Sequence, residues 1–369
     1  MAPAAPDRFR LFGDFRLRLE QDWDSRRGDG GQRDDRLRLR VRLRGGAELH
    51  LGSHWSLAAR LRTGSHLSQQ SPHVTIHDFD GGPEGPYQVD FDRWIGRYAA
   101  GGFVAWAGRN ELSLWRQDDL FVSGNVTFVG SGARLRHRWG ERRSLTVNAN
   151  YVALPAGMRE LSGRAVVGQL VYDVGLGDDE ASPPGLTVAA AYWESRADPA
   201  DPDGEVLLTD NDLRDYRVAS LQLQYRTSLL GKGLRVGLDW LRNLESYSRA
   251  PAGSFSRFHR DDVDGAVVAV LWGDDQEAGD WMFGLYLAHL EALSVHSSYN
   301  SDDFVRWGNS DQVRGTNLEG VELRVRRALG RKMSLLLRAF VVDALERLEP
   351  GDVARETGNR VRIDWNVEF

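Results

Sequence analysis

Arginine alternates with aliphatic residues, without interruption, across nine consecutive positions of the chain, residues 36–44. The segment reads Arg-Leu-Arg-Leu-Arg-Val-Arg-Leu-Arg. Successive side chains of a β-strand point to opposite faces, whereas an α-helix repeats about every 3.6 residues. The two-residue period therefore predicts a strand that has one arginine face and one aliphatic face.

The same period recurs along the whole chain, for example at residues 9–23, 145–151, 219–226 and 361–369. Counting such runs gives about sixteen, the even number that single-chain bacterial barrels have. The strands are expected to begin near residues 8, 35, 55, 89, 102, 125, 143, 164, 185, 215, 233, 261, 279, 315, 332 and 356. The sequence thus predicts an all-β fold, a transmembrane antiparallel up-and-down β-barrel.

The composition agrees with such a barrel and excludes other classes. No run of eighteen or more apolar residues is present, which excludes helical membrane spans, while alternating strands give a low mean hydropathy of −0.45. The absence of cysteine removes disulfides and thiolate metal sites. A net charge of −6 argues against a nucleic-acid partner. Among the 47 basic residues only Lys232 and Lys332 are lysines, and the others are arginines.

The connections between the expected strands fall into two classes. Tight turns are expected at residues 52–54, 99–102, 140–142, 231–233 and 330–332, and somewhat longer ones at 175–185 and 273–279. Long polar loops are expected between them, at residues 25–34, 65–88, 113–124, 155–163, 197–214, 246–260, 293–313 and 346–355. Short turns at one rim and long loops at the other are typical of transmembrane barrels.

The tryptophans beside the expected turns and the two ends of the chain support the same interpretation. Trp55, Trp139, Trp272 and Trp281 lie beside expected short turns, where an interfacial girdle is found. The last strand resembles that of bacterial outer-membrane proteins generally, because it alternates up to a terminal phenylalanine, Phe369. The first residues lack the basic and apolar segments of a signal peptide. We expect residues 1–7 to be an extension and residues 8–369 a single barrel domain.

Two segments resemble the family of Gram-negative outer-membrane porins. The first is Phe12-Gly-Asp-Phe-Arg-Leu-Arg-Leu-Glu20, with the arginine strand, Gly46-Ala-Glu48, Trp55 and Arg60-Leu-Arg-Thr-Gly64 behind it. The second is Gly108-Arg-Asn-Glu-Leu112, with Trp115, Asp118-Asp-Leu120 and Gly132-Ala-Arg-Leu-Arg136. The resemblance covers about the first 140 residues and implies passive transport through the lumen of an outer-membrane barrel. A looser similarity is to alginate-export channels, which share arginine-rich strands.

If the aliphatic faces meet lipid, the arginine faces line the lumen, because an arginine facing the bilayer midplane costs about 2–4 kcal/mol. The expected pore-lining residues are Arg16, Arg18, Arg36, Arg38, Arg40, Arg42, Arg60, Arg62, Arg134 and Arg136, with Asp118 and Asp119 as an opposing negative side. Alternatively, the arginines form salt-bridge ladders with carboxylates such as Glu20, Glu48, Glu111, Glu322 and Asp364. The third long loop is expected to be short for a deep constriction.

These residues leave several functions open. The first is a channel for passive diffusion of small hydrophilic solutes or ions, with anions attracted by the arginines. The alternatives are a dedicated channel for an acidic oligosaccharide, or a barrel that serves as an enzyme or as a structural part of an envelope complex. No catalytic residue, cofactor or metal is assigned, and the spacing of His66, His73 and His77 is interpreted as a surface loop. Outer-membrane lipid and a homotrimer are the expected partners.

Overall fold

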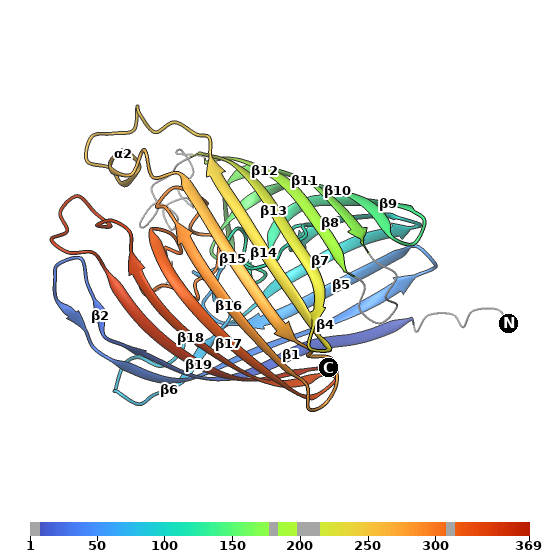
Figure 1. Cartoon of the computed structure of the whole chain (residues 1–369), viewed down its shortest axis with the longest axis horizontal. Coiled ribbons are helices and arrows are strands. Elements are labelled where there is room, and N and C mark those ends of the chain that lie inside the picture. Colours follow the sequence, from blue (N-terminus) through green and yellow to red (C-terminus); the bar gives the residue numbers. More distant parts are fainter. Residues whose placement is uncertain (1–7, 177–183, 198–214, 308–313) are drawn as a thin grey trace.

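The structure is a computed structural model that describes residues 8–176, 184–197, 215–307 and 314–369. It is one antiparallel sheet closed on itself (Figure 1). The strands that run around the barrel are β1 (Phe9–Trp23), β4 (Arg36–Leu51), β5 (Trp55–Thr63), β7 (Val89–Ala100), β8 (Phe103–Asn110), β9 (Phe128–Trp139), β10 (Arg143–Ala156), β11 (Glu160–Gly175), β12 (Gly185–Arg196), β13 (Tyr216–Leu229), β14 (Lys232–Asn243), β15 (Asp264–Gly273), β16 (Trp281–Leu290), β17 (Leu318–Gly330), β18 (Met333–Ala344) and β19 (Thr357–Glu368). The sixteen strands confirm the predicted number.

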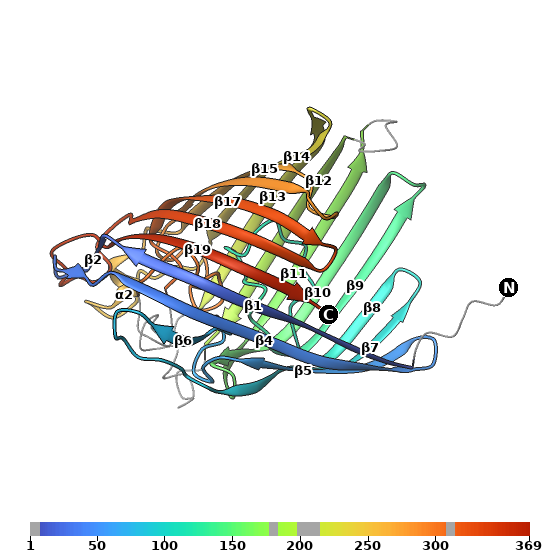
Figure 2. The same ribbon diagram turned by 90° about the horizontal axis from the view of Figure 1, so that it is seen from below.

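Closure of the barrel rests on β1. It pairs with β19 along one edge, where Phe15 lies opposite Val367, and with β4 along the other, where Phe15 lies opposite Leu43. Figure 2 shows β1 between these two strands. The remaining long strands each pair with their neighbours in chain order, so the barrel has no open edge. Smaller elements are β2 (Ser25–Arg26), β3 (Gln32–Arg33), β6 (Val74–Asp78), which pairs with β4, and the one-turn helix α2 (Phe255–Phe258).

Burial along the strands is the reverse of that in a water-soluble protein. On β18, Leu335 and Leu337 are exposed, whereas Arg338 beside them is buried. On β1, Leu19 is exposed and Glu20 is fully buried. The outer surface is thus aliphatic and the interior polar, an arrangement suited to hydrocarbon around the barrel. No helix in the ranges that the structure describes is long and apolar enough to cross a bilayer.

The two rims differ as the sequence predicts. The turns at residues 52–54, 101–102, 140–142, 230–231 and 331–332 are tight, and the C-terminus lies on this short-turn rim. Figure 2 shows β2, β6 and α2 at the opposite end. Trp55, Trp139 and Trp281 are about half exposed at the short-turn rim, at 55%, 49% and 44%, which confirms the placement of the aromatic residues there.

One predicted loop is wrong. Residues 155–163 were expected to form a long loop, but β10 continues to Ala156 and β11 begins at Glu160. Pro155 is tolerated in the strand because the register of β10 against β11 shifts between Ala153 and Pro155. Most of the expected loop at 197–214, and the expected extension at 1–7, lie outside the described residues.

Candidate functional site

The inner face of β1, β4 and β19 carries a dense network of arginines and carboxylates. Glu20, fully buried, lies at its centre and pairs with Arg38, with Arg40 at 3.1 Å and with Arg362 at 2.5 Å. Each carboxylate oxygen therefore meets at least one guanidinium, which offsets the large cost of burying these charges.

The neighbouring arginines are also paired with carboxylates. The shortest ion pair of Arg18 is with Asp364 at 2.7 Å, that of Arg42 is with Asp14 at 2.6 Å, and that of Arg60 is with Asp92 at 2.8 Å. Arg16 donates to Asn366 at 2.6 Å and lies 3.5 Å from Asp364. Ion pairs of the expected kind thus exist at Glu20 and Asp364 on this wall, at Glu111 after β8 and at Glu322 on β17, whereas Glu48 forms none within the described ranges.

Two of the expected pore-lining arginines bind a loop. Arg36 pairs with Asp78 of β6 at 2.5 Å. Arg62, almost fully buried, donates to the backbone carbonyls of Ser65, Ser68 and Gln69. Both guanidinium groups therefore fasten residues 64–88, between β5 and β7, to the barrel.

The inner loop, residues 111–127 between β8 and β9, folds into the lumen. The amide of Ser113 donates to Asn150 of β10 at 2.9 Å, and the amide of Trp115 donates to Gln169 of β11 at 2.7 Å. Gln169 returns a hydrogen bond to the Trp115 carbonyl at 2.8 Å. The expectation that this loop is short for a deep constriction is therefore wrong, because inward-facing amides on the wall satisfy its backbone.

The tip of the inner loop reaches β14. Gln117 donates to the carboxylate of Asp239 and, at 3.3 Å, to the Leu238 carbonyl. Asp118 shares a hydrogen bond with the carboxyl of Asp239. Burial, together with the charge of Asp239, raises the pKa of the Asp118 carboxyl well above its ordinary value. When one of the two carboxyl groups is protonated, the hydrogen bond between them joins the loop to the wall.

Asp118 and Asp119 line a cavity of about 290 Å³. Arg324 of β17 and Arg338 of β18 line the same cavity, together with Glu322. The two aspartates therefore face positive charge, as the sequence suggests, but on β17 and β18 rather than on the β1, β4 and β5 wall. Arg338, which pairs with Glu322 at 2.6 Å, was not among the residues singled out in the sequence.

A second loop crosses the lumen. The sequence predicts a long polar loop at residues 293–313 but not this course across the barrel. This crossing loop, residues 291–307, begins after β16 and reaches the opposite side of the barrel, where the Tyr299 hydroxyl donates to the Pro155 carbonyl at 3.2 Å. The Ser123 amide of the inner loop donates to the Tyr299 carbonyl at 2.8 Å. Gln69 donates to the Ser298 carbonyl at 2.8 Å. Three loops are therefore joined inside the barrel.

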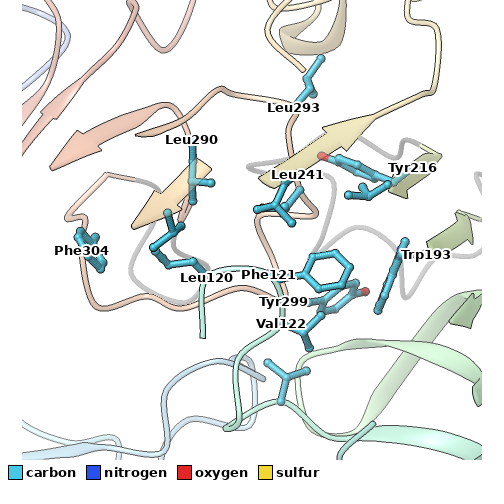
Figure 3. Packing of buried hydrophobic residues seen from close by; sticks show 14 of the residues in the cluster. Leu120, Phe121, Val122, Trp193, Tyr216, Leu241, Leu290, Leu293, Tyr299 and Phe304 are labelled. Carbon is cyan, nitrogen blue, oxygen red and sulfur yellow. The ribbon is translucent and has the colours of Figure 1, made fainter. Parts of the chain in front are cut away.

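An apolar cluster lies where these loops meet β12, β13 and β14 (Figure 3). The Tyr299 ring lies 5.3 Å from that of Phe128 and 6.1 Å from that of Trp193. Further members are Leu120, Phe121, Val122, Tyr216, Leu241, Leu290, Leu293 and Phe304. The apolar content of residues 290–307 is the sequence signal that distinguishes this segment from a solvated loop.

A larger cavity, the vestibule, lies between the inner loop and strands β7 to β12 near the short-turn rim. Its volume is about 860 Å³, and Arg134 and Arg136 line it. Both arginines are exposed and, within the described ranges, neither forms an ion pair, although Arg136 donates to Ser144 at 3.1 Å. Their role as pore-lining residues stays a prediction, as it does for the other arginines and for Asp118 and Asp119.

The three histidines of residues 64–88 go to different places. His66 bonds to Gln88 at 2.6 Å and His77 to Glu84 at 3.1 Å. His73 is buried, and that burial, together with nearby arginines such as Arg18 and Arg40, lowers its pKa well below the ordinary value. In the part of the chain that the structure describes, no group of three potential ligands could hold a metal ion.

Solved porin structures resemble this barrel over nearly their whole length. The high-pH structure of Pseudomonas putida OprB matches with a TM-score of 0.57 and 13% identity, covering 98% of this chain and 94% of that one. Salmonella typhi OmpF in complex with daunomycin matches with a TM-score of 0.53 and 10% identity, covering 98% of this chain and 97% of that one. A triple mutant of the Rhodopseudomonas blastica porin matches with a TM-score of 0.50 and 13% identity, covering 98% of this chain and 100% of that one.

No protein-family model matches the sequence, and no curated protein matches it either. The looser similarity to alginate-export channels stays a prediction. The likeness to solved structures concerns the fold, and it agrees with the closure and strand number described above. The chain has the fold of the porins, a closed antiparallel barrel of sixteen strands.

Proposed function

We propose that the chain is a porin of the bacterial outer membrane, a channel for passive diffusion of small hydrophilic solutes and ions rather than an enzyme. The porin fold and the aliphatic outer face support this proposal. A polar lumen inside a lipid-facing barrel is the physical requirement for a water-filled path across a membrane.

The observation that carries the proposal is the charge of the vestibule. Its lining includes five arginines, Arg93, Arg116, Arg134, Arg136 and Arg138, and two carboxylates, Glu111 and Asp173. A cavity with an excess of positive charge concentrates anions and raises their rate of entry. We therefore infer a preference for small anions over cations.

The path through the barrel follows from the two cavities. Arg116 of the inner loop lines both the vestibule and the 290 Å³ cavity beside β17 and β18. A solute that enters from the short-turn rim would pass Arg116 and then move between Asp118 and Arg324. The inner loop is thus the proposed constriction, with Arg116 as the residue common to both sides of it.

Planar-bilayer recording of the purified, refolded protein in a KCl gradient tests this function. The expected result is stepwise conductance with a reversal potential on the anion-selective side. The double variant R134Q/R136Q is expected to move the reversal potential toward cation preference without loss of the barrel. A matched control is R196Q, because Arg196 lies at the long-loop end of β12, where it pairs with Glu194 and Asp215. An unchanged reversal potential in the double variant would contradict the vestibule's role.

A second candidate, a channel for an acidic oligosaccharide, is favoured by one observation. Trp115 lines the vestibule together with the arginines. An aromatic ring can stack on a sugar ring while guanidinium groups bind its carboxylates. Saturable block of the chloride current by a uronic-acid oligosaccharide, weakened in W115A but not in W139A, would support this candidate. If millimolar concentrations of the oligosaccharide do not block the current, the result favours the channel for passive diffusion of small solutes.

We further propose a homotrimer, as in general porins. Cross-linking in detergent followed by mass determination tests this state, and a protein that is monomeric at micromolar concentration would exclude it. Conductance in steps of three would give independent support.

A further inference from the structure

An aromatic pocket lies on the outside of the barrel, at the short-turn rim. Its volume is about 480 Å³, a size typical of ligand sites, and Trp272, Trp281 and Phe283 line it together with Lys232 and Asp280. On β16 the residues alternate between exposed and buried, and Trp281 and Phe283 are on the exposed side with Leu285. The pocket therefore opens toward the surroundings of the barrel and not toward the lumen.

The floor of the pocket is a stack of three rings. Phe283 lies between the two tryptophans, 5.9 Å from the ring of Trp272 and 6.3 Å from that of Trp281, and nearly parallel to both. The Trp272 indole donates to the Leu229 carbonyl at 2.9 Å, which fixes its orientation. A flat apolar floor at the edge of the aliphatic belt fits an acyl chain near its glycerol end.

Charged groups of both signs surround this floor. The guanidinium of Arg327 lies 4.9 Å from the centre of the Trp281 ring, directly opposite it in the β16–β17 register. Arg327 is exposed, and it forms no ion pair with any residue in the described ranges. An arginine on the outward face of a barrel is costly unless it reaches an anionic group at the interface.

Asp280 is the carboxylate that lines the pocket. Asp280 is the last residue of the turn at 274–280, and its backbone carbonyl accepts from the amide of Ala328, the residue next to Arg327, at 3.0 Å. Lys232 pairs with Asp274 at 2.9 Å and lies 3.9 Å from Asp280. The lysine thus lies closer to Asp274. One oxygen of Asp280 accepts from the Glu277 amide at 2.9 Å, and the other, 3.9 Å from the lysine, accepts no hydrogen bond within the described ranges. The pocket lining and Arg327, which contacts the Trp281 ring at its border, therefore offer an anion and a cation beside an apolar floor.

We propose that this pocket binds one zwitterionic phospholipid with a primary ammonium head group, phosphatidylethanolamine, from the leaflet at the short-turn rim. Arg327 binds the phosphate, Asp280 accepts a hydrogen bond from the ammonium, and the acyl chain lies on the ring stack. This combination of charges discriminates between head groups. A purely anionic lipid leaves Asp280 repelled, and a quaternary ammonium has no N–H to donate. The site goes beyond the proposed channel function and is independent of it.

Native mass spectrometry of the detergent-purified, refolded protein tests the site. The probe is an equimolar mixture of phosphatidylethanolamine, phosphatidylcholine and phosphatidylglycerol with identical acyl chains. The expected result is one retained phosphatidylethanolamine per chain. R327Q and D280N are each expected to lower the retained fraction about fivefold to tenfold, the loss of a charge-assisted hydrogen bond. The matched control R331Q, an exposed arginine in the turn between β17 and β18, is expected to retain the lipid.

Three results would overturn the proposal. Equal retention of phosphatidylethanolamine by R327Q and the native chain would show that Arg327 does not bind the phosphate. Equal or stronger retention of phosphatidylglycerol would show a positive patch without head-group selection, and equal retention of phosphatidylcholine would show that Asp280 accepts no hydrogen bond from the ammonium. A chain that retains the lipid but does not conduct would contradict the channel function and leave the lipid site standing. Circular dichroism of each variant verifies that the barrel is folded.

Discussion

Asp303 of the crossing loop forms an ion pair with Arg362 of β19, and the same guanidinium pairs with Glu20 of β1. The other oxygen of Asp303 pairs with Arg338 of β18. Burial opposes ionisation of Asp303, but Arg338 and Arg362 outweigh it and hold the pKa of the carboxyl well below its ordinary value. The loop is thus fastened to the barrel by the same arginine network that lines it.

Removal of this carboxylate is expected to release the crossing loop. In D303N, Arg338 and Arg362 lose a shared partner, and breaking a buried pair costs about 3–5 kcal/mol. Limited proteolysis should then cleave D303N within residues 291–307 at protease concentrations that leave the native chain intact. The control is D302N, which removes the same charge one position away, where Asp302 offers a backbone carbonyl to Arg360 at 3.4 Å. Equal resistance of D303N and the native chain would contradict the anchoring role.

The Tyr299 ring is expected to hold the crossing loop in the lumen by packing. Y299A removes a fully buried ring from between Phe128 and Trp193, at a cost of about 3–5 kcal/mol to the packed loop. Single-channel conductance should increase because the loop leaves the lumen, while the β-sheet signal in circular dichroism stays the same. Y299F keeps the ring and loses only the hydrogen bond to Pro155, so its conductance should stay close to the native value.

A rise in pH is expected to weaken the docking of the tip of the inner loop. The pKa of Asp118 is raised in the docked loop, so docking binds a proton more tightly than the released state does. The stabilisation is complete below the ordinary pKa of about 4 and is lost as pH rises through the raised pKa. Conductance recorded between pH 5 and 10 should therefore change in one titration step. D118N mimics the protonated form and should abolish the step, whereas D119N, one residue along, should keep it.

Glu20 is expected to be the residue on which the arginine wall depends most. E20Q leaves Arg38, Arg40 and Arg362 without their common carboxylate, which should lower the free energy of unfolding by about 3–5 kcal/mol. Urea unfolding in detergent micelles, followed by tryptophan fluorescence, measures this change. E48Q on β4 is the control, with an expected change below about 1 kcal/mol because Glu48 borders an open cavity. Similar midpoints for both variants would show that the network adds no stability.

The barrel could be predicted from the sequence because its information is local. The period of residues 36–44 determines which side chains face outward, and the turns at 52–54 and 140–142 determine which rim is which. Pro155 misled the prediction, because a proline at a strand end beside a register shift reads like a loop residue.

The interior could not be predicted in the same way. The contacts of Tyr299 with Pro155 and of Gln69 with Ser298 join residues that are far apart in the chain. Loop segments of this kind have no period, so nothing in the sequence states which wall they reach. The choice between free and paired arginines also depends on the register that brings Arg18 opposite Asp364. Only the apolar residues of the crossing loop gave a local signal that it is buried.

Single-channel recording of the folded, full-length chain in planar bilayers tests the central claim most directly. The account predicts discrete conductance steps with a preference for chloride over potassium, reduced in R134Q/R136Q. A sample that shows the full β-sheet signal and remains without conductance across the membrane would contradict a water-filled channel in this barrel.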